Sequence, residues 1–297
     1  MNARECGFLL LTSHLGDPDR KPLTMAQFRE MAYYAWKLRG MDMTAQLTGE
    51  DLQYIGYKPQ VAEHVIKLLS QQDQLEWYVQ EGKKKGCVPI TRVSDAYPVK
   101  IRQCLDFESP GSLWAKGDIS LLKMPAAALV GNRNLNIFNE AFACEVGYQA
   151  AQQGYVLVSG NARGADRVAQ DSCLAAGGKV ISVVADALEN CPDDPNVLYL
   201  SEEGYDLGFS AARALSRNRV IHCLAQLTFV AQCTHRKGGT WNGVVKNLKY
   251  QWSLVFCPED GSEVMGELFD RGAKPVRGIH LEDFARLLDS CKGFLDD

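Results

Sequence analysis

The sequence predicts an α/β protein: a mainly parallel sheet with helices on both faces, preceded by a small helical domain. Between residues 126 and 257, short apolar runs alternate with longer amphipathic runs, which is the rhythm of βαβ units. Two of the apolar runs lead into turns that contain glycine and arginine. Before residue 83, apolar residues recur at helical spacing. We therefore predict a helical domain over 1–82 and an α/β domain over 83–297.

The composition is that of a globular protein in a reducing compartment. Of its 297 residues, 46% are hydrophobic and 23% are charged. No apolar run reaches the roughly 18 residues that a membrane span needs, and the apolar run near the N-terminus is too short and too mixed for a secretory signal. The ten cysteines include no CxxC pair, so their spacing does not indicate a zinc site. We expect a cytoplasmic protein with reduced thiols, no membrane contact, no metal and no cofactor.

Short helices joined by tight turns are predicted for the first domain. A helix over 24–38 begins with Thr24 as its N-cap. A shorter helix includes residues 52–55, and a longer helical run covers 60–80. The three lysines at 83–85 follow in a linker-like segment, where they allow two interpretations: a solvated turn or a contact to phosphate.

From residue 87 the chain alternates between strand and helix patterns. An edge strand is predicted over 87–90, because Pro89 cannot donate to a sheet ladder. Further strands are predicted over 127–130, 155–159, 180–184, 197–200, 227–231 and 253–257. Helices are predicted over 136–153, 164–176 and 241–250, and a single helical turn over 219–224. Strands buried on both faces account for the continuous apolar runs.

Glycine and arginine follow two of the predicted strands. The strand 127–130 runs into Gly131-Asn132-Arg133, and the strand 155–159 runs into Gly160-Asn161-Ala162-Arg163-Gly164. Open α/β sheets bind ligands at the carboxyl ends of their strands, and turns that open a helix favour anions. We therefore predict a phosphate-bearing ligand. For Arg163 a second interpretation is open, an internal ion pair with Asp166.

A long basic segment indicates a larger anion. The chain has a net charge of -4 and a pI of about 5.8, yet residues 207–258 contain no Asp or Glu. The cations of this segment are Arg213, Arg217, Arg219, Arg236, Lys237, Lys246 and Lys249. Such an asymmetric charge distribution favours a polyanion as ligand. For Lys246 and Lys249, an ordinary solvated helix face is the alternative.

No catalytic arrangement is visible in the sequence. His222 and His235 lie in the basic segment, and neither has an acidic residue near it in the sequence. Trp241 and Tyr205 allow two interpretations, stacking on nucleic-acid bases or packing in the core.

At these positions the sequence resembles the DprA/Smf family of DNA-processing proteins. The family's V-G-S-R turn corresponds to residues 130–133, its S-G-G-A-R-G-I-D turn to 159–166, and its R-N-R-I-I to 217–221. Further matches are a Ser-Glu pair at 201–202, the basic turn at 236–240, a Tyr-Pro pair at 97–98 and the stretch 110–117. Each motif alone is common, but their shared order over residues 24–280 is specific. Asn132 and Asn161 depart from the family pattern, as does the stretch 211–216.

The resemblance implies a Rossmann-like α/β domain after a SAM-like helical domain, without a C-terminal winged helix. It also implies a non-enzymatic protein that binds single-stranded DNA in DNA uptake, transformation or recombination. A RecA-type recombinase and a second copy of the chain are the further partners that it implies. The alternative is an enzyme that hydrolyses a nucleoside monophosphate at a similar Gly-Gly-Thr turn. Such enzymes typically carry a Glu shortly after the threonine. Here no Asp or Glu follows Thr240 before Glu259, which favours the binding protein.

The candidate site for DNA or phosphate combines these motifs. Gly131 and Gly160 are expected to let the ligand approach the backbone, while Arg133 and Arg163 pair with phosphate oxygens. The full set of candidates is Gly131, Asn132, Arg133, Ser159, Gly160, Arg163, Gly164, Arg217, Asn218, Arg219, Lys237, Gly238, Gly239 and Thr240.

Overall fold

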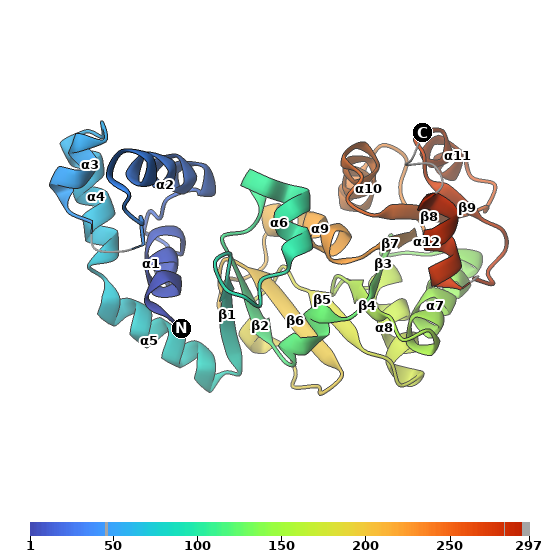
Figure 1. Cartoon of the computed structure of the whole chain (residues 1–297). Coiled ribbons are helices and arrows are strands. Elements are labelled where there is room, and N and C mark those ends of the chain that lie inside the picture. Colours follow the sequence, from blue (N-terminus) through green and yellow to red (C-terminus); the bar gives the residue numbers. More distant parts are fainter. Residues whose placement is uncertain (45–46, 282, 293–297) are drawn as a thin grey trace. The chain divides into compact units, whose positions relative to one another are not determined.

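A computed structural model describes residues 1–44, 47–281 and 283–292 of the protein (Figure 1). The chain divides into two compact units. The first comprises residues 1–116, 186–191 and 201–208, and the second comprises the other described residues. None of the helices described is long and apolar enough to span a membrane.

Four helices of the first unit share one hydrophobic core, and a fifth helix follows them. They are α1 (Ala3–Thr12), α2 (Met25–Arg39), α3 (Gly49–Tyr54), α4 (Pro59–Leu69) and α5 (Gln72–Lys84). The helix predicted over 24–38 is confirmed as α2, and the Thr24 hydroxyl caps it by accepting the Gln27 amide. Phe8, Phe28 and Leu52 lie in the shared core. The apolar run near the N-terminus thus belongs to a packed helix, α1.

The single helical run predicted over 60–80 is wrong, because two helices, α4 and α5, cover it. The reason lies in side chains that satisfy the last carbonyl groups of α4. The Ser70 hydroxyl donates to the carbonyl of Lys67 at 2.9 Å. The buried Arg20 guanidinium donates to the carbonyl of Leu68 at 3.5 Å and to the side chain of Gln71 at 2.9 Å. A tertiary contact therefore ends the helix. The predicted boundary between residues 82 and 83 lies inside α5.

The rest of the first unit is a β-hairpin with short helices. The strands β1 (Cys87–Thr91) and β2 (Ser112–Lys116) pair in antiparallel fashion. Between them lie α6 (Val99–Leu105) and the 3-10 turn η1 (Asp106–Glu108). The strand predicted over 87–90 is confirmed.

Tyr205 belongs to the core of the first unit. Its ring stacks on Tyr78 at 4.6 Å and contacts Trp114 at 4.9 Å. Because only 2% of Tyr205 is exposed, the core interpretation holds for it and base stacking does not.

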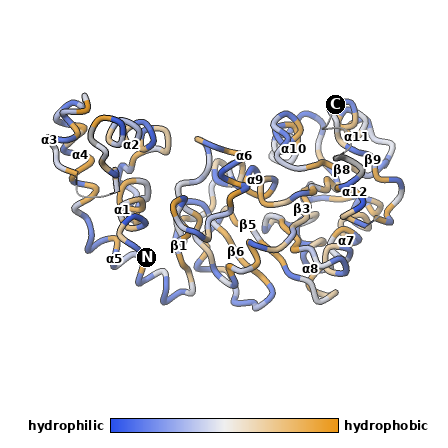
Figure 2. The backbone as a smooth tube through the Cα atoms, in the orientation of Figure 1, coloured by the Kyte–Doolittle hydropathy of each residue, from blue (hydrophilic) through white to orange (hydrophobic). Residues whose placement is uncertain are grey.

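The second unit contains seven parallel strands. They are β3 (Ala126–Val130), β4 (Val156–Ser159), β5 (Val180–Val183), β6 (Val197–Glu202), β7 (Leu227–Val230), β8 (Leu254–Pro258) and β9 (Lys274–Val276). The helices are α7 (Ile137–Gln152), α8 (Ala165–Ala175), α9 (Ala211–Leu224), α10 (Gly238–Tyr250), α11 (Glu263–Asp270) and α12 (Phe284–Lys292), with the 3-10 turn η2 (Ile119–Lys123). The strands β3 to β8 are apolar, as Figure 2 shows for β3, and are almost entirely buried. Lys274 and Pro275 of β9 are exposed.

The strand order of this unit is β6-β5-β4-β3-β7-β8-β9. The chain winds from β3 outward through β4, β5 and β6, then returns through α9 to β7 and winds the other way. Since crossovers between parallel strands are right-handed, α7 and α8 cover one face while α9 and α10 cover the other (Figure 1). The predicted Rossmann-like α/β class is confirmed. The winding direction reverses between β3 and β7, and such a switch point is where open α/β sheets bind ligands.

The helical turn predicted over 219–224 is the end of a much longer helix, α9. Ser210 caps its first turn by accepting the amide of Arg213. Good helix formers, among them Ala211 and Ala212, follow at once. The consequence is that Arg217 and Asn218 lie in the middle of a helix rather than beside a turn.

Candidate nucleic-acid interface

A pocket of about 410 Å³ lies at the switch point of the second unit. The turn after β3 forms one wall with Gly131, Asn132 and Arg133, and α9 forms the opposite wall. The first turn of α10 closes a third side. Its lining includes the candidates Gly131, Asn132, Arg133, Arg217, Asn218, Gly239 and Thr240. Half of the predicted set therefore meets around one cavity.

Arg217 lines this pocket, and its guanidinium contacts other groups of the protein. Its guanidinium donates to the carbonyl of Val183 at 2.6 Å and lies 3.7 Å from the carboxylate of Asp166. Only 12% of the Arg217 side chain and 9% of the Asp166 side chain are exposed. Burial raises the pKa of Asp166, and the nearby Arg217 opposes that shift. Arg217 thus keeps a small exposed fraction at the pocket, but it lies in the middle of α9 and not beside a turn as expected.

The two turn glycines make room for protein atoms. A Cβ at Gly160 would overlap the Arg217 guanidinium, and a Cβ at Gly131 would overlap the side chain of Ala165. Both glycines therefore accommodate packed protein atoms, and Gly131 also lines the pocket. Arg163 is exposed, and the guanidinium next to Asp166 is that of Arg217.

Backbone hydrogen bonds tie the turns together. The amide of Asn132 donates to Gln232 at 2.9 Å, and the amide of Ala165 donates to Asn132 at 3.1 Å. Gly164 has a φ of +80°, and a Cβ there would overlap the carbonyl of Arg133. Only glycine fits this position without strain. The wall of the pocket that carries Arg133 is therefore fixed by the start of α8.

Hydrogen bonds also connect the first turn of α10 to the turn after β3 and to α9. The Thr240 hydroxyl donates to the carbonyl of Gly131 at 3.0 Å, while the Asn218 amide donates to the carbonyl of Gly239 at 3.1 Å. Thr240 thus links the first turn of α10 to the turn after β3 instead of capping its own helix. Trp241 is only 6% exposed, so it packs in the core.

The loop before α10 is held by an ion cluster that the sequence did not reveal. Glu267, on α11, accepts hydrogen bonds from His235 at 2.6 Å, Arg236 at 3.1 Å and Arg271 at 2.7 Å. Hydrogen bonds from Arg271, His235 and Arg236 lower the pKa of Glu267 to about 2. Arg236 adopts a φ of +53° within this loop. His235 therefore has an acidic partner, 32 residues later in the chain.

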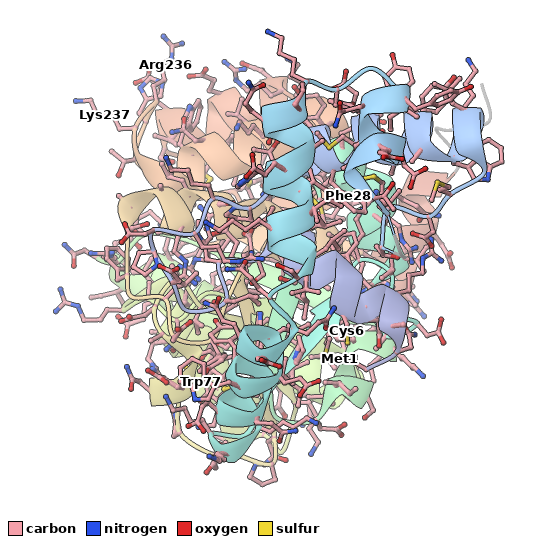
Figure 3. All side chains as sticks on the ribbon, turned by 90° about the vertical axis from the view of Figure 1, so that its left-hand side faces the viewer. Met1, Cys6, Phe28, Trp77, Arg236 and Lys237 are labelled. Carbon is pink, nitrogen blue, oxygen red and sulfur yellow. The ribbon has the colours of Figure 1, made fainter. Side chains whose placement is uncertain are left out.

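Several candidates lie outside the pocket. Lys237 is exposed, and its side chain points away from the ribbon in Figure 3, as does that of Arg236. Ser159 and Gly160 are buried at the end of β4. Arg163, Gly164, Arg219 and Gly238 are the other candidates that do not line the cavity. Sequence reasoning missed Phe209, which precedes α9, and Leu215, Ile221 and His222, which lie on α9, as residues of the pocket. Placing the last three together requires the full extent of that helix.

The fold and the pocket define a Rossmann-like α/β protein with a ligand pocket at its topological switch point. The chain belongs to the family described as DNA recombination-mediator protein A, whose model matches residues 89–286.

Curated relatives support this assignment. The chain is 31% identical over 156 residues to DNA processing protein DprA of Streptococcus pneumoniae, which covers 49% of this chain and 54% of that protein. It is 26% identical over 167 residues to DprA of Bacillus subtilis, which covers 52% and 56%. The chain thus spans about half the length of the curated relatives it matches.

Solved structures agree in fold. The X-ray structure of DprA from Streptococcus pneumoniae is 24% identical with a TM-score of 0.70, and the match covers 93% of this chain and 95% of that one. A DprA structure from Helicobacter pylori, described for its single-stranded DNA binding mode, is 22% identical with a TM-score of 0.56. That match covers 70% of this chain and 96% of the other.

Proposed function

We propose that this protein binds single-stranded DNA and mediates recombination or DNA uptake without catalysing a reaction. The observation that carries the proposal is the pocket at the carboxyl ends of the parallel strands, which is lined by the motifs of the family. Arg133 lies exposed at that pocket, next to the buried Arg217. A guanidinium is well suited to a phosphate oxygen because it donates in a fixed fork.

The charges of the lining favour a binding protein over an enzyme. Among the described residues that line the pocket, Asp166 is the one carboxylate. It accepts the amide of Ala162 at 3.2 Å and faces Arg217, so it holds a structural position. A hydrolase of nucleotides would need an acid or base directed at water.

The wider role of the protein is part of the proposal. A RecA-type recombinase, a second copy of the chain and a cytoplasmic location follow from the resemblance to DprA proteins. We also propose that residues 1–82 act as a SAM-like helical module, which the shared core of α1 to α4 supports.

A preference for single strands tests the function directly. We expect labelled oligo-dT to bind more tightly than a duplex of the same length, because a cavity of about 410 Å³ has room for part of one strand and not for the width of a duplex. Fluorescence anisotropy at fixed salt measures both affinities. The same samples are assayed for release of phosphate and free base from nucleoside monophosphates. Equal or tighter binding of duplex, or turnover of a nucleotide, would contradict the proposal.

A further inference from the structure

Three arginines of the first unit lie close together, and none of them lines the pocket of the second unit. Arg29 lies on α2, Arg92 follows β1, and Arg102 lies on α6. Burial lowers the pKa of Arg92, and the positive charges of Arg29 and Arg102 lower it further. Because like charges at this proximity repel one another, this arginine cluster favours an anion from outside the chain.

Contacts within the protein balance only part of this charge. The carboxylate of Asp106 accepts a hydrogen bond from Arg29 at 3.1 Å, and the backbone carbonyl of Asp106 accepts one from Arg92 at 3.1 Å. The Nε–H group of Arg102 is buried and has no hydrogen-bond partner among the described residues. Asp106 thus offsets one of the three cations and leaves Arg102 with donors to spare.

Exposed aromatic rings lie beside the arginine cluster. The Cζ atom of Arg29 is 3.1 Å from the centroid of the Phe107 ring, and Phe107 is 56% exposed. Tyr33 and Trp36, on α2, are 52% and 71% exposed. Arg29, Tyr33 and Trp36 are spaced by four and three residues, so they share one face of the helix. Large apolar rings exposed together mark a surface that binds a partner.

The alternation of cations and aromatic rings decides which partner fits. A single nucleic-acid strand presents a phosphate and an uncovered base at each nucleotide. Guanidinium groups suit the phosphate, and aromatic rings stack on the base. A partner helix with an apolar face would instead bury the arginine charges without anions. The sequence agrees, because residues 25–39 and 92–108 together contain six Lys or Arg against four Asp or Glu, in a chain with a net charge of -4.

We propose that this surface of the first unit is a second contact for single-stranded DNA. The arginine cluster of Arg29, Arg92 and Arg102 holds a phosphate group, while Tyr33 and Trp36 stack on bases. This inference rests on the proposed function, since the ligand is the same. The pocket of the second unit does not depend on it.

The stacking is tested by Trp36→Ala, with Trp77→Ala as the matched control. Trp77 is 60% exposed on α5 (Figure 3), but one turn away on either side its helix carries Asp73 and Glu81 instead of cations. Alanine favours a helix, so both variants should fold. We expect Trp36→Ala to weaken binding of oligo-dT at least about fivefold, the lower range for one stacked base. Trp77→Ala should leave the affinity unchanged.

The phosphate contact is tested by Arg102→Gln, with Lys123→Gln as the control. Lys123 is exposed in the 3-10 turn η2, before β3. Arg102→Gln should flatten the slope of log affinity against log salt by about 0.7, the contribution of one phosphate on a single strand. The control should keep the slope of the unaltered protein.

An abasic strand of the same length separates the two kinds of contact. Fluorescence anisotropy should show that Arg102→Gln weakens oligo-dT and the abasic strand by the same factor, whereas Trp36→Ala weakens oligo-dT alone. Trp36→Phe, which keeps a ring, should retain most of the affinity for oligo-dT. Thermal melting of each variant confirms that it is folded.

The outcomes distinguish this second contact from the proposed function. If folded Trp36→Ala and Arg102→Gln variants bind oligo-dT like the unaltered protein, the second contact is overturned and the pocket remains. Equal weakening of both strands by Trp36→Ala would overturn the stacking. Unchanged DNA binding together with binding of an acidic peptide that Arg102→Gln weakens would assign the surface to a protein partner instead. If the unaltered protein binds no single strand, the proposed function fails and the second contact with it.

Discussion

At the scale of single residues, Arg217 shows that an arginine of a family motif can have a structural role beside the site. Its charge lies against Asp166 with both side chains nearly buried. Removing one partner of a buried ion pair leaves the other charge without compensation, which costs about 3 kcal/mol or more. We expect Arg217→Ala to lower the free energy of unfolding by roughly this amount at pH 7, measured by urea denaturation.

The matched control removes both charges. Arg217→Met with Asp166→Asn should recover more than half of that loss, because neither group then remains charged in the interior. Unfolding of Arg217→Ala at the same urea concentration as the unaltered protein would contradict a structural role. If Arg217→Ala binds DNA more weakly, the loss can therefore come from unfolding as well as from a missing contact to DNA.

Sequence motifs could identify which residues gather at the pocket but not which way each faces. Gly131, Asn132, Arg133, Asn218 and Thr240 meet as the order of the motifs implied. The partner of Asp166 could not be read from the sequence, since Arg163 is three residues away and Arg217 is 51. The nearer arginine is exposed, and the distant one packs over Gly160.

At the scale of elements, the helix α11 controls the loop before α10. Glu267 holds His235 and Arg236, the residues that lead into the exposed Lys237. We expect Glu267→Gln to speed amide hydrogen exchange of residues 233–238, because the charge-assisted hydrogen bonds to that loop are weakened. Mass spectrometry of the exchanged peptides measures the effect.

The same helix supplies the control for that change. Glu263→Gln alters an exposed carboxylate in the first turn of α11 and should leave exchange in the loop unchanged. Equal exchange in the Glu267→Gln variant and the unaltered protein would show that the ion cluster does not hold the loop. Because the pKa of Glu267 is about 2, the cluster's contribution is complete above pH 4.5 and is lost as pH falls toward 2.

Element positions follow from the sequence where the signal is local. Most strands from 126 to 258 were predicted to within about two residues, because buried parallel strands are continuous apolar runs. The break between α4 and α5 depends on Arg20, some 50 residues earlier, and no local signal marks it. The start of α9 was missed because Ser210 and the alanines after it carry no amphipathic pattern.

At the scale of the whole molecule, attraction to DNA must come from the distribution of charge rather than its sum. The net charge is -4, yet residues 207–258 contain no carboxylate. For single strands, log affinity against log salt has a slope of about -0.7 per phosphate neutralised. We expect Arg133→Ala and Lys237→Ala each to flatten the slope by about 0.7, measured by titrations over a range of salt.

Lys249→Ala is the matched control for these two variants. Lys249 is exposed in the last turn of α10, whereas Lys237 precedes its first turn. The control should leave both affinity and slope unchanged. A folded Arg133→Ala or Lys237→Ala variant with an unaltered slope would remove that residue from the interface.

The packing of Arg217 over Gly160 restricts how these two motifs can diverge in evolution. A Cβ at position 160 overlaps the guanidinium, so a side chain there requires residue 217 to move or to become shorter. A shorter residue at 217, in turn, leaves Asp166 buried without a cation. We therefore expect substitutions at these two positions, 57 residues apart in the chain, to be coupled. We expect a single substitution at position 160 or 217 to lower the stability of the protein. Prior replacement of Asp166 by an uncharged residue should reduce that loss.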